Sequence, residues 1–113
     1  MTQWEIWTWD FVDPDGKRAG PHPAVIVSHE DRVAQKQIVN VLYCSSQRAS
    51  RPPHENEIIL DEADGLDWET LCRCDVLYLV DKCWLKNRRG SVIPARRPQI
   101  VRRMIESCGW PLY

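Results

Sequence analysis

The sequence predicts a mainly β fold, a small antiparallel β-barrel with one α-helix at its C-terminal end. Three observations lead to this class. Short apolar, β-branched runs recur along the chain, turn-forming residues separate them, and a stripe of apolar residues at helical spacing follows near the end. The chain has 113 residues, 43% hydrophobic and 27% charged, which predicts one globular domain over residues 1–113.

The first expected element is a strand rich in aromatic residues. Residues 4–11 alternate in the period of two that a strand requires, so one face carries Trp7, Trp9 and Phe11. Such a row of aromatics usually packs in a core or an interface. The strand is expected to end in a turn, because Asp13–Gly16 supplies the proline and glycine that tight turns favour.

A polar loop and a buried strand are expected next. The loop ends in Pro-His-Pro at residues 21–23, and the uninterrupted apolar run Ala24–Val27 follows at once. Such a run is typical of a buried strand. We therefore expect His22 to lie on a loop beside a core strand, an arrangement that often holds a functional site. Residues 28–37 are polar and are expected to form another loop.

The middle of the chain contains the strongest β signals. Ile38–Cys44 is almost wholly apolar, as a central strand would be, and Leu71–Val80 is the longest β-like run. The remaining assignments are a short strand at 57–60, a turn at Gly65, a short strand or bend at 81–85, a basic turn at 86–90 and a small strand at 91–93.

The last element is predicted to be a helix that starts at Pro98. Proline suits the first helical position, and Gly109 is a stop signal. The apolar stripe is expected to pack on the core and consists of Ile100, Val101, Met104, Ile105 and Cys108. Trp110 follows this helix, and a tryptophan in that position usually packs down on the body of the protein.

Composition excludes several classes of protein. No apolar stretch approaches the ~18 residues of a membrane span, and the N-terminus lacks the regions of a signal peptide, so we expect a cytoplasmic protein that does not bind membranes. The five cysteines lack the spacing of a disulfide framework or a zinc site, which predicts reduced, buried thiols and no metal. The net charge of −1 gives no overall nucleic-acid signature, although basic residues cluster locally.

One pair of charged residues lies inside the longest strand. Arg73 and Asp75 are two residues apart and so project to the same side, whereas Cys72, Cys74 and Val76 point the other way. One interpretation is a structural ion pair near a strand end. The other is a catalytic pair that acts on a phosphodiester, and both interpretations stay open at this point.

RNA cleavage by its own 2′-hydroxyl shows how such a pair could work. It needs a base for the hydroxyl proton, an acid for the leaving 5′-oxygen and a cation for the phosphate charge. Asp75 could be the base. Arg73 is a good cation but a poor acid, because a guanidinium group keeps its proton. A histidine, with an unperturbed pKa of about 6.5, is a better donor, and only His22 stands between prolines beside a core strand.

Several motifs in the right order give the chain a resemblance to a known family, the MazF/PemK/Kid toxins of bacterial type II toxin–antitoxin systems. Residues 4–14 resemble the family's first strand and turn, and residues 20–28 resemble its Gly-x-Arg-Pro-Val-Val-Ile-Val signature. Cys44-Ser45-Ser46 falls where the family often has Thr-Ser. Arg73-Cys74-Asp75 matches a segment of the PemK/Kid branch, and the order of residues 82–108 is similar.

The resemblance implies a homodimeric, SH3-like barrel of the CcdB/PemK type that cleaves single-stranded RNA without a metal or another cofactor. It also implies a cognate antitoxin whose extended segment covers the RNA groove. Carried over by position, Arg73 and Asp75 match the acid and base of the branch, and Ser45 or Ser46 matches its substrate-side hydroxyl. The residues expected to bind RNA are Lys17, Arg18, Ser46, Arg48 and Arg51.

His22 is the main departure from the family pattern, because it stands where the family has a loop arginine. The Kid-branch loop histidine falls near Lys17 or Arg18. Either His22 is the catalytic acid while Lys17 or Arg18 supplies charge, or the nuclease activity is lost. The alternatives are therefore an inactive binding module for antitoxin or RNA, or a CcdB-like gyrase poison, to which Trp110 lends support.

Overall fold

The sheet is strongly curled and carries one helix at the C-terminal end, which confirms the predicted fold class. The computed structural model describes residues 1–12, 15–16 and 18–110. Its strands and helices are β1 (Glu5–Val12), β2 (Arg18–Ile26), α1 (Glu30–Gln35), β3 (Ile38–Cys44), β4 (Glu57–Leu60), β5 (Thr70–Asp81), β6 (Lys86–Ser91) and α2 (Arg97–Cys108). Three short 3₁₀ helices are η1 (Glu62–Asp64), η2 (Lys82–Trp84) and η3 (Pro94–Arg96).

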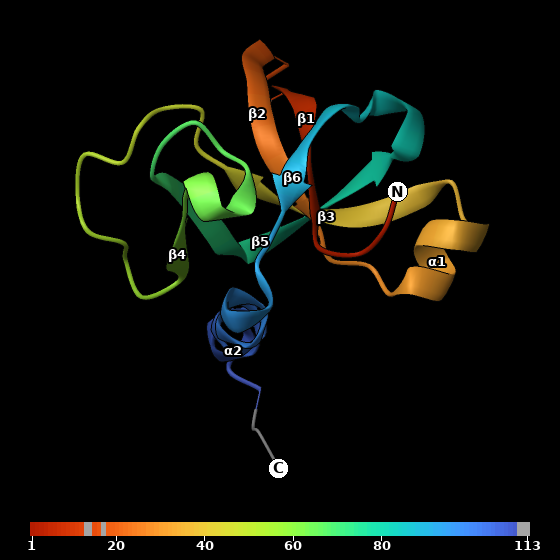
Figure 1. Cartoon of the computed structure of the whole chain (residues 1–113). Coiled ribbons are helices and arrows are strands. Elements are labelled where there is room, and N and C mark those ends of the chain that lie inside the picture. The colour runs from red at the N-terminus through yellow and green to blue at the C-terminus, as the bar shows by residue number, and fades with distance from the viewer. Residues whose placement is uncertain (13–14, 17, 111–113) are drawn as a thin grey trace.

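The strands form one antiparallel sheet in the order β4-β5-β3-β2-β1-β6. Figure 1 shows that the sheet curls into a half-barrel, with α2 beneath it and α1 at one side. Helix α2 packs against β5 and β4. Its observed bounds confirm the predicted C-terminal helix, and Gly109 ends it in a left-handed conformation with φ 69°, which glycine adopts without strain.

Two sequence assignments were wrong because the elements are short and polar. Helix α1 lies in the segment expected to be a loop; Val33 is its one buried residue among the described side chains, and the His29 side chain caps its first turn through Asp31 N–H at 3.1 Å. Strand β6 lies where a basic turn was expected. Within the described residues it is an edge strand paired with β1, and its Lys86 and Arg88 side chains are exposed to solvent.

The ends of several other elements also differ from the sequence assignments. Trp4 has φ 74° and precedes β1, and the segment after Asp81 forms the 3₁₀ helix η2 where a strand or bend was expected. Residues 92 and 93 lie outside β6, so no separate small strand forms there. Asp13 and Pro14 of the expected first turn, and the side chain of Phe11, lie outside the described part of the chain.

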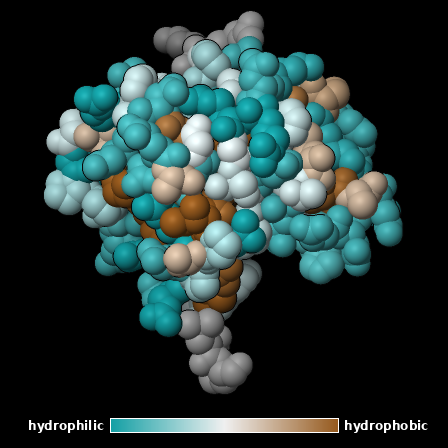
Figure 2. Space-filling view, in the orientation of Figure 1, coloured by the Kyte–Doolittle hydropathy of each residue, from teal (hydrophilic) through white to brown (hydrophobic). Residues whose placement is uncertain are grey.

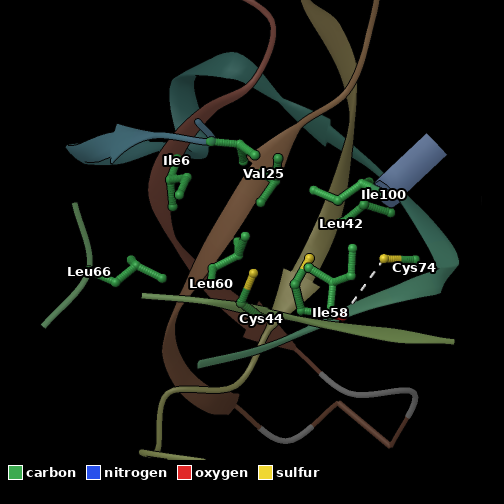
Figure 3. Packing of buried hydrophobic residues seen from close by; sticks show 11 residues of the cluster. Ile6, Val25, Leu42, Cys44, Ile58, Leu60, Leu66, Cys74 and Ile100 are labelled. Atoms are coloured by element: carbon green, nitrogen blue, oxygen red, sulfur yellow. Dashed lines mark hydrogen bonds between the residues drawn. The ribbon is translucent and has the colours of Figure 1, made fainter. Parts of the chain in front are cut away.

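The core divides between the two faces of the sheet. The first core cluster fills the inside of the half-barrel and includes Ile6, Val25, Leu42, Leu60, Cys72 and Ile100 (Figure 3). The second core cluster lies on the other face, where Val33 of α1 packs, and includes Ala24, Ile26, Val33, Val41, Val80 and Leu85. Trp7, Trp9 and Tyr78 pack at the rim of this second cluster. Strands β2 and β3 therefore carry buried residues on both faces, as their continuous apolar runs require.

A buried ion network holds the segment before α2. Asp64 is 1% exposed and accepts hydrogen bonds from the backbone N–H groups of Ile93 and Asp61, each at 2.9 Å. Arg96 donates to Asp64 and, through both terminal nitrogens, to Asp61 at 2.9 and 3.1 Å. The hydrogen bond from Arg96 lowers the pKa of Asp61. These charges therefore link η1 to the segment before α2.

Three of the five cysteines are buried and two are exposed, which corrects the expectation that all are buried. Cys44, Cys72 and Cys74 belong to the first core cluster, and Cys83 and Cys108 are exposed; all five are described and none forms a disulfide. The neighbouring Cys44 thiol and burial raise the pKa of Cys72. The buried thiols therefore act as neutral core side chains.

Trp110 is 67% exposed, so it does not pack down on the body of the protein as expected. Within the described part of the chain, no helix has both the length and the apolar character needed to cross a bilayer.

Candidate active site

A row of polar and aromatic side chains crosses four neighbouring strands on one face of the sheet. Tyr43 of β3 is the cross-strand partner of Ala24 on β2, and its ring centroid lies 4.7 Å from that of His22. Arg73 of β5 is the cross-strand partner of Glu57 on β4. Side chains at paired positions project to the same face of a sheet. The row therefore brings together residues that are far apart in the sequence.

Arg73 and Asp75 lie side by side on β5, as the alternation predicted. Arg73 Nη2 is 3.4 Å from Asp75 Oδ2, while Cys72 and Cys74 are buried on the other face. The two charged side chains are 45% and 26% exposed, so solvent reaches both of them. An exposed ion pair of this kind contributes little to stability. Because the pair is weak and solvent-accessible, the guanidinium group is available to a ligand.

His22 lies within a strand, which corrects the expectation that it lies on a loop. Strand β2 begins six residues earlier than expected, because residues 18–23 pair with β1; His22 itself is opposite Trp9. Strand β3 pairs with β2 only from Ala24 onward, so Pro21 and Pro23 occupy a part of β2 that has one neighbouring strand. Proline is tolerated in such a segment because one side of the backbone makes no ladder hydrogen bonds.

The contacts of His22 fix its ring. The ring is 6% exposed, and its Nδ1 lies 3.2 Å from the backbone carbonyl oxygen of Cys44. A carbonyl oxygen can only accept a hydrogen bond, so Nδ1 is the donor in this contact and Nε2 is the other ring nitrogen. Tyr43 packs against the same ring. The His22 ring is therefore held in position by two residues of β3.

Ser45 follows β3 and lies between two pockets. The first has a volume of about 330 Å³ and is lined by His22, Ser45, Ser46, Trp68, Thr70 and Arg89, among others. The second has a volume of about 290 Å³ and is lined by Tyr43, Ser45, Arg48, Arg51, Glu57 and Arg73, among others. Ser45 Oγ accepts a hydrogen bond from Gln47 N–H at 3.1 Å, and a hydroxyl that accepts can still donate its own proton.

The predicted RNA-binding residues differ in their surroundings. The Arg48 guanidinium carbon lies 5.7 Å from the centroid of the Trp68 ring. Arg51 makes a bidentate ion pair with Glu57, at 2.7 and 3.0 Å. Lys17 lies outside the described residues. Arg18 begins β2, but its side chain is also outside the described part.

Not every predicted site residue shares one pocket. His22 and Ser46 line the first pocket, Arg73, Arg48 and Arg51 line the second, and Ser45 joins them. Asp75 lines a separate apolar groove beside α2 and meets the others through its ion pair with Arg73. Among the described residues, no group of three or more histidine, cysteine, aspartate or glutamate side chains is arranged to hold a metal ion.

Sequence reasoning missed four residues of the site: Tyr43, Glu57, Trp68 and Thr70. Tyr43 is the penultimate residue of β3, where a single phenol in a largely apolar run was the available signal. Glu57 opens β4 and is 5% exposed, which its sequence context does not indicate. The contacts of Tyr43 and Glu57 depend on how the strands pair, which local sequence patterns do not specify.

The Arg51–Glu57 pair predicts acid sensitivity. Its hydrogen bonds lower the pKa of Glu57 from 4.5 to about 2. A carboxyl with a depressed pKa contributes stability that is fully present above about pH 4.5 and is lost as the pH falls toward 2. We expect Glu57→Gln to lower the free energy of unfolding at neutral pH by about 1–3 kcal/mol, and to flatten its decline over this window. Urea unfolding at several pH values measures both effects.

The matched control is Glu62→Gln, which neutralises an exposed glutamate of η1. It is expected to change the free energy of unfolding by less than about 0.5 kcal/mol at neutral pH. An identical pH dependence for Glu57→Gln and the unmodified chain would contradict the assignment.

A comparison with protein-family models gives one match over nearly the whole chain. The family described as "PemK-like, MazF-like toxin of type II toxin-antitoxin system" matches residues 2–108. A search of the curated proteins found no significant match.

Solved structures from mycobacteria and from Deinococcus radiodurans share this fold. A mycobacterial endoribonuclease in complex with its cognate antitoxin has a TM-score of 0.82 at 18% identity, and the match covers 100% of this chain and 99% of that chain. The Mycobacterium tuberculosis toxin MazF-mt6 gives 0.79 at 15%, covering 96% and 99%. A MazE–MazF structure from Deinococcus radiodurans gives 0.70 at 12%, covering 98% and 97%. At these identities the likeness establishes the fold alone.

Proposed function

Because the chain belongs to the PemK-like, MazF-like toxins of type II toxin–antitoxin systems, we propose that it is a metal-independent endoribonuclease that cleaves single-stranded RNA and inhibits growth. One observation carries the proposal. His22 and Tyr43 are in ring contact, and Ser45 lines both the pocket of His22 and the pocket of Arg73, so an imidazole, a hydroxyl and a guanidinium group lie in adjoining pockets.

In the proposed reaction the 2′-oxygen of the RNA attacks the adjacent phosphorus, and the bond to the 5′-oxygen breaks. Asp75 accepts the proton of the 2′-hydroxyl, and Arg73 stabilises the charge that develops on the phosphate. Ser45 donates a hydrogen bond to the substrate. Arg48, Arg51 and Ser46 contact neighbouring parts of the strand, and Lys17 and Arg18 are further candidates for such contacts. The products are a 2′,3′-cyclic phosphate and a 5′-hydroxyl.

His22 is proposed as the acid that protonates the leaving 5′-oxygen through Nε2. We expect cleavage by the unmodified chain to depend on the protonation state of His22. In His22→Gln this dependence should disappear, and the rate should fall by about 10²–10⁴-fold. The measurement is a pH–rate profile of both proteins on one RNA oligonucleotide.

The control for this assignment is His54→Gln. It removes an exposed histidine whose backbone N–H, and not its ring, donates to Glu57. It should keep both the rate and the pH profile. An unchanged profile in His22→Gln would count against His22 as the acid.

The function itself is tested by incubating the purified chain with single-stranded RNA in the presence of EDTA. Cleavage with 2′,3′-cyclic phosphate ends, together with growth arrest on expression, supports the proposal. RNA that stays intact at every pH while an antitoxin-like peptide still binds would favour the inactive binding module. Intact RNA with inhibited DNA gyrase would favour the gyrase poison, for which exposed Trp110 remains the candidate residue.

We also propose that the chain acts as a cytoplasmic homodimer that binds a cognate antitoxin. The support is an apolar surface: Leu77 and Leu79 are exposed on β5, and Val101 and Trp110 are exposed on and after α2. Figure 2 shows apolar patches of this kind within an otherwise hydrophilic face. Sedimentation equilibrium of Leu79→Lys, compared with Lys36→Gln at another exposed position, separates a dimer interface from a general surface effect.

A further inference from the structure

Tyr43 lies at the centre of the candidate site. It is the penultimate residue of β3, and its ring lies 4.7 Å from the His22 ring, with an angle of 39° between the two planes. Arg73 lines the same pocket as Tyr43, and its charge acts on the phenol. Tyr43 therefore contacts the proposed acid and shares a pocket with the proposed cation.

The pocket that Tyr43 lines suits an anion. Its volume is about 290 Å³, and its lining includes the hydroxyls of Tyr43 and Ser45 together with three arginines, against which Glu57 is the one carboxylate among the described lining residues. Glu57 is already paired with Arg51. Positive charge therefore exceeds negative charge around Tyr43, as a phosphate group requires.

The phenol has the chemistry of a fixed hydrogen-bond donor. Burial raises the pKa of Tyr43, and the nearby charge of Arg73 opposes this only in part. The hydroxyl therefore keeps its proton at neutral pH. Because the ring packs on His22, the donor is already oriented before a substrate binds, which is the property that favours stabilisation of developing charge.

We propose that the Tyr43 hydroxyl donates a hydrogen bond to a non-bridging oxygen of the scissile phosphate, beside Arg73. This role rests on the proposed ribonuclease function and adds a catalytic residue to it. Tyr43 makes no covalent bond in this step and neither gains nor loses a proton. Its contribution is to stabilise the charge on one of the two non-bridging oxygens.

The test uses RNA oligonucleotides with a phosphorothioate at the cleavage site, as two separate diastereomers. Sulfur is a weak hydrogen-bond acceptor, so one diastereomer should react more slowly with the unmodified chain. Tyr43→Phe keeps the ring and removes only the hydroxyl. It should lower the rate on the natural phosphate by about tenfold to hundredfold. It should also bring the ratio of the cleavage rates of the two diastereomers toward one.

The matched control is Tyr78→Phe. Tyr78 also carries a phenol beside the second core cluster, but its ring packs edge-on against Trp9, with centroids 5.5 Å apart. It should keep both the rate and the diastereomer difference. Thermal unfolding of the two variants shows whether each remains folded.

A binding measurement separates this inference from the proposed function. The same phosphorothioates are placed in a 2′-deoxy oligonucleotide, which cannot be cleaved by 2′-hydroxyl attack. If the unmodified chain cleaves no RNA but distinguishes the bound diastereomers, and Tyr43→Phe does not, the phosphate contact stands and the nuclease function fails. If Tyr43→Phe keeps the diastereomer difference of the unmodified chain, or neither protein shows any, the inference is overturned.

Discussion

Arg73→Ala is expected to lower the rate of RNA cleavage by about 10²–10³-fold and to abolish growth arrest. The reason is that Arg73 is the cation of the second pocket best placed to act on the phosphate, since Arg51 is occupied by Glu57 and Arg48 lies over Trp68. Loss of one pre-oriented donor to developing charge typically has an effect of this size. The measurement is kcat on a single-stranded RNA oligonucleotide.

The same substitution should leave the fold intact. Arg73 is half-exposed, and its described ion pair with Asp75 is long, at 3.4 Å, so its removal should change the free energy of unfolding by less than about 1 kcal/mol. Arg73→Lys keeps the charge without the planar fork and should recover only part of the rate. Arg102→Ala, which removes an exposed arginine from α2, is the matched control and should cleave normally. Normal cleavage by Arg73→Ala would show that another group stabilises the phosphate.

Elements with a clear apolar pattern in the sequence could be predicted. The strand at 57–60 has the expected bounds, which follow its short apolar run. Helix α2 differs from the expected helix by one residue at its start, because apolar spacing and Gly109 define it. Strand β6 could not be predicted, because an edge strand needs no apolar run and its pairing with Ile6 is distant in sequence. Helix α1 was missed for a related reason, since it buries only Val33 among its described side chains.

The same distinction applies to the candidate site. The common side of Arg73 and Asp75 follows from alternation along one strand, and the structure places their side chains together. The position of His22 depends on the pairing of β2 with β1, and its contact with Tyr43 depends on the pairing of β2 with β3. Contacts across strands are set by register, which local sequence patterns do not specify.

Asp64→Ala is expected to cause the largest loss of stability, about 3–5 kcal/mol in the free energy of unfolding. Asp64 is almost fully buried and accepts hydrogen bonds from the Ile93 and Asp61 N–H groups as well as from Arg96. Its removal leaves two backbone donors and part of a guanidinium group without their acceptor inside the protein. Since small domains are stable by about 5–15 kcal/mol, a loss of this size is easily measured by urea unfolding.

Asp67→Ala provides the control, because it removes an exposed aspartate three residues away that pairs with Arg89 at 2.9 Å. It should change the free energy of unfolding by at most about 1 kcal/mol. Asp64→Asn keeps the size and one acceptor oxygen but turns an N–H₂ group toward other donors, so an intermediate loss is expected. Equal losses for Asp64→Ala and Asp67→Ala would contradict a buried network, and would imply that Leu66, Val92 and Ile100 hold this end of the core by apolar packing alone.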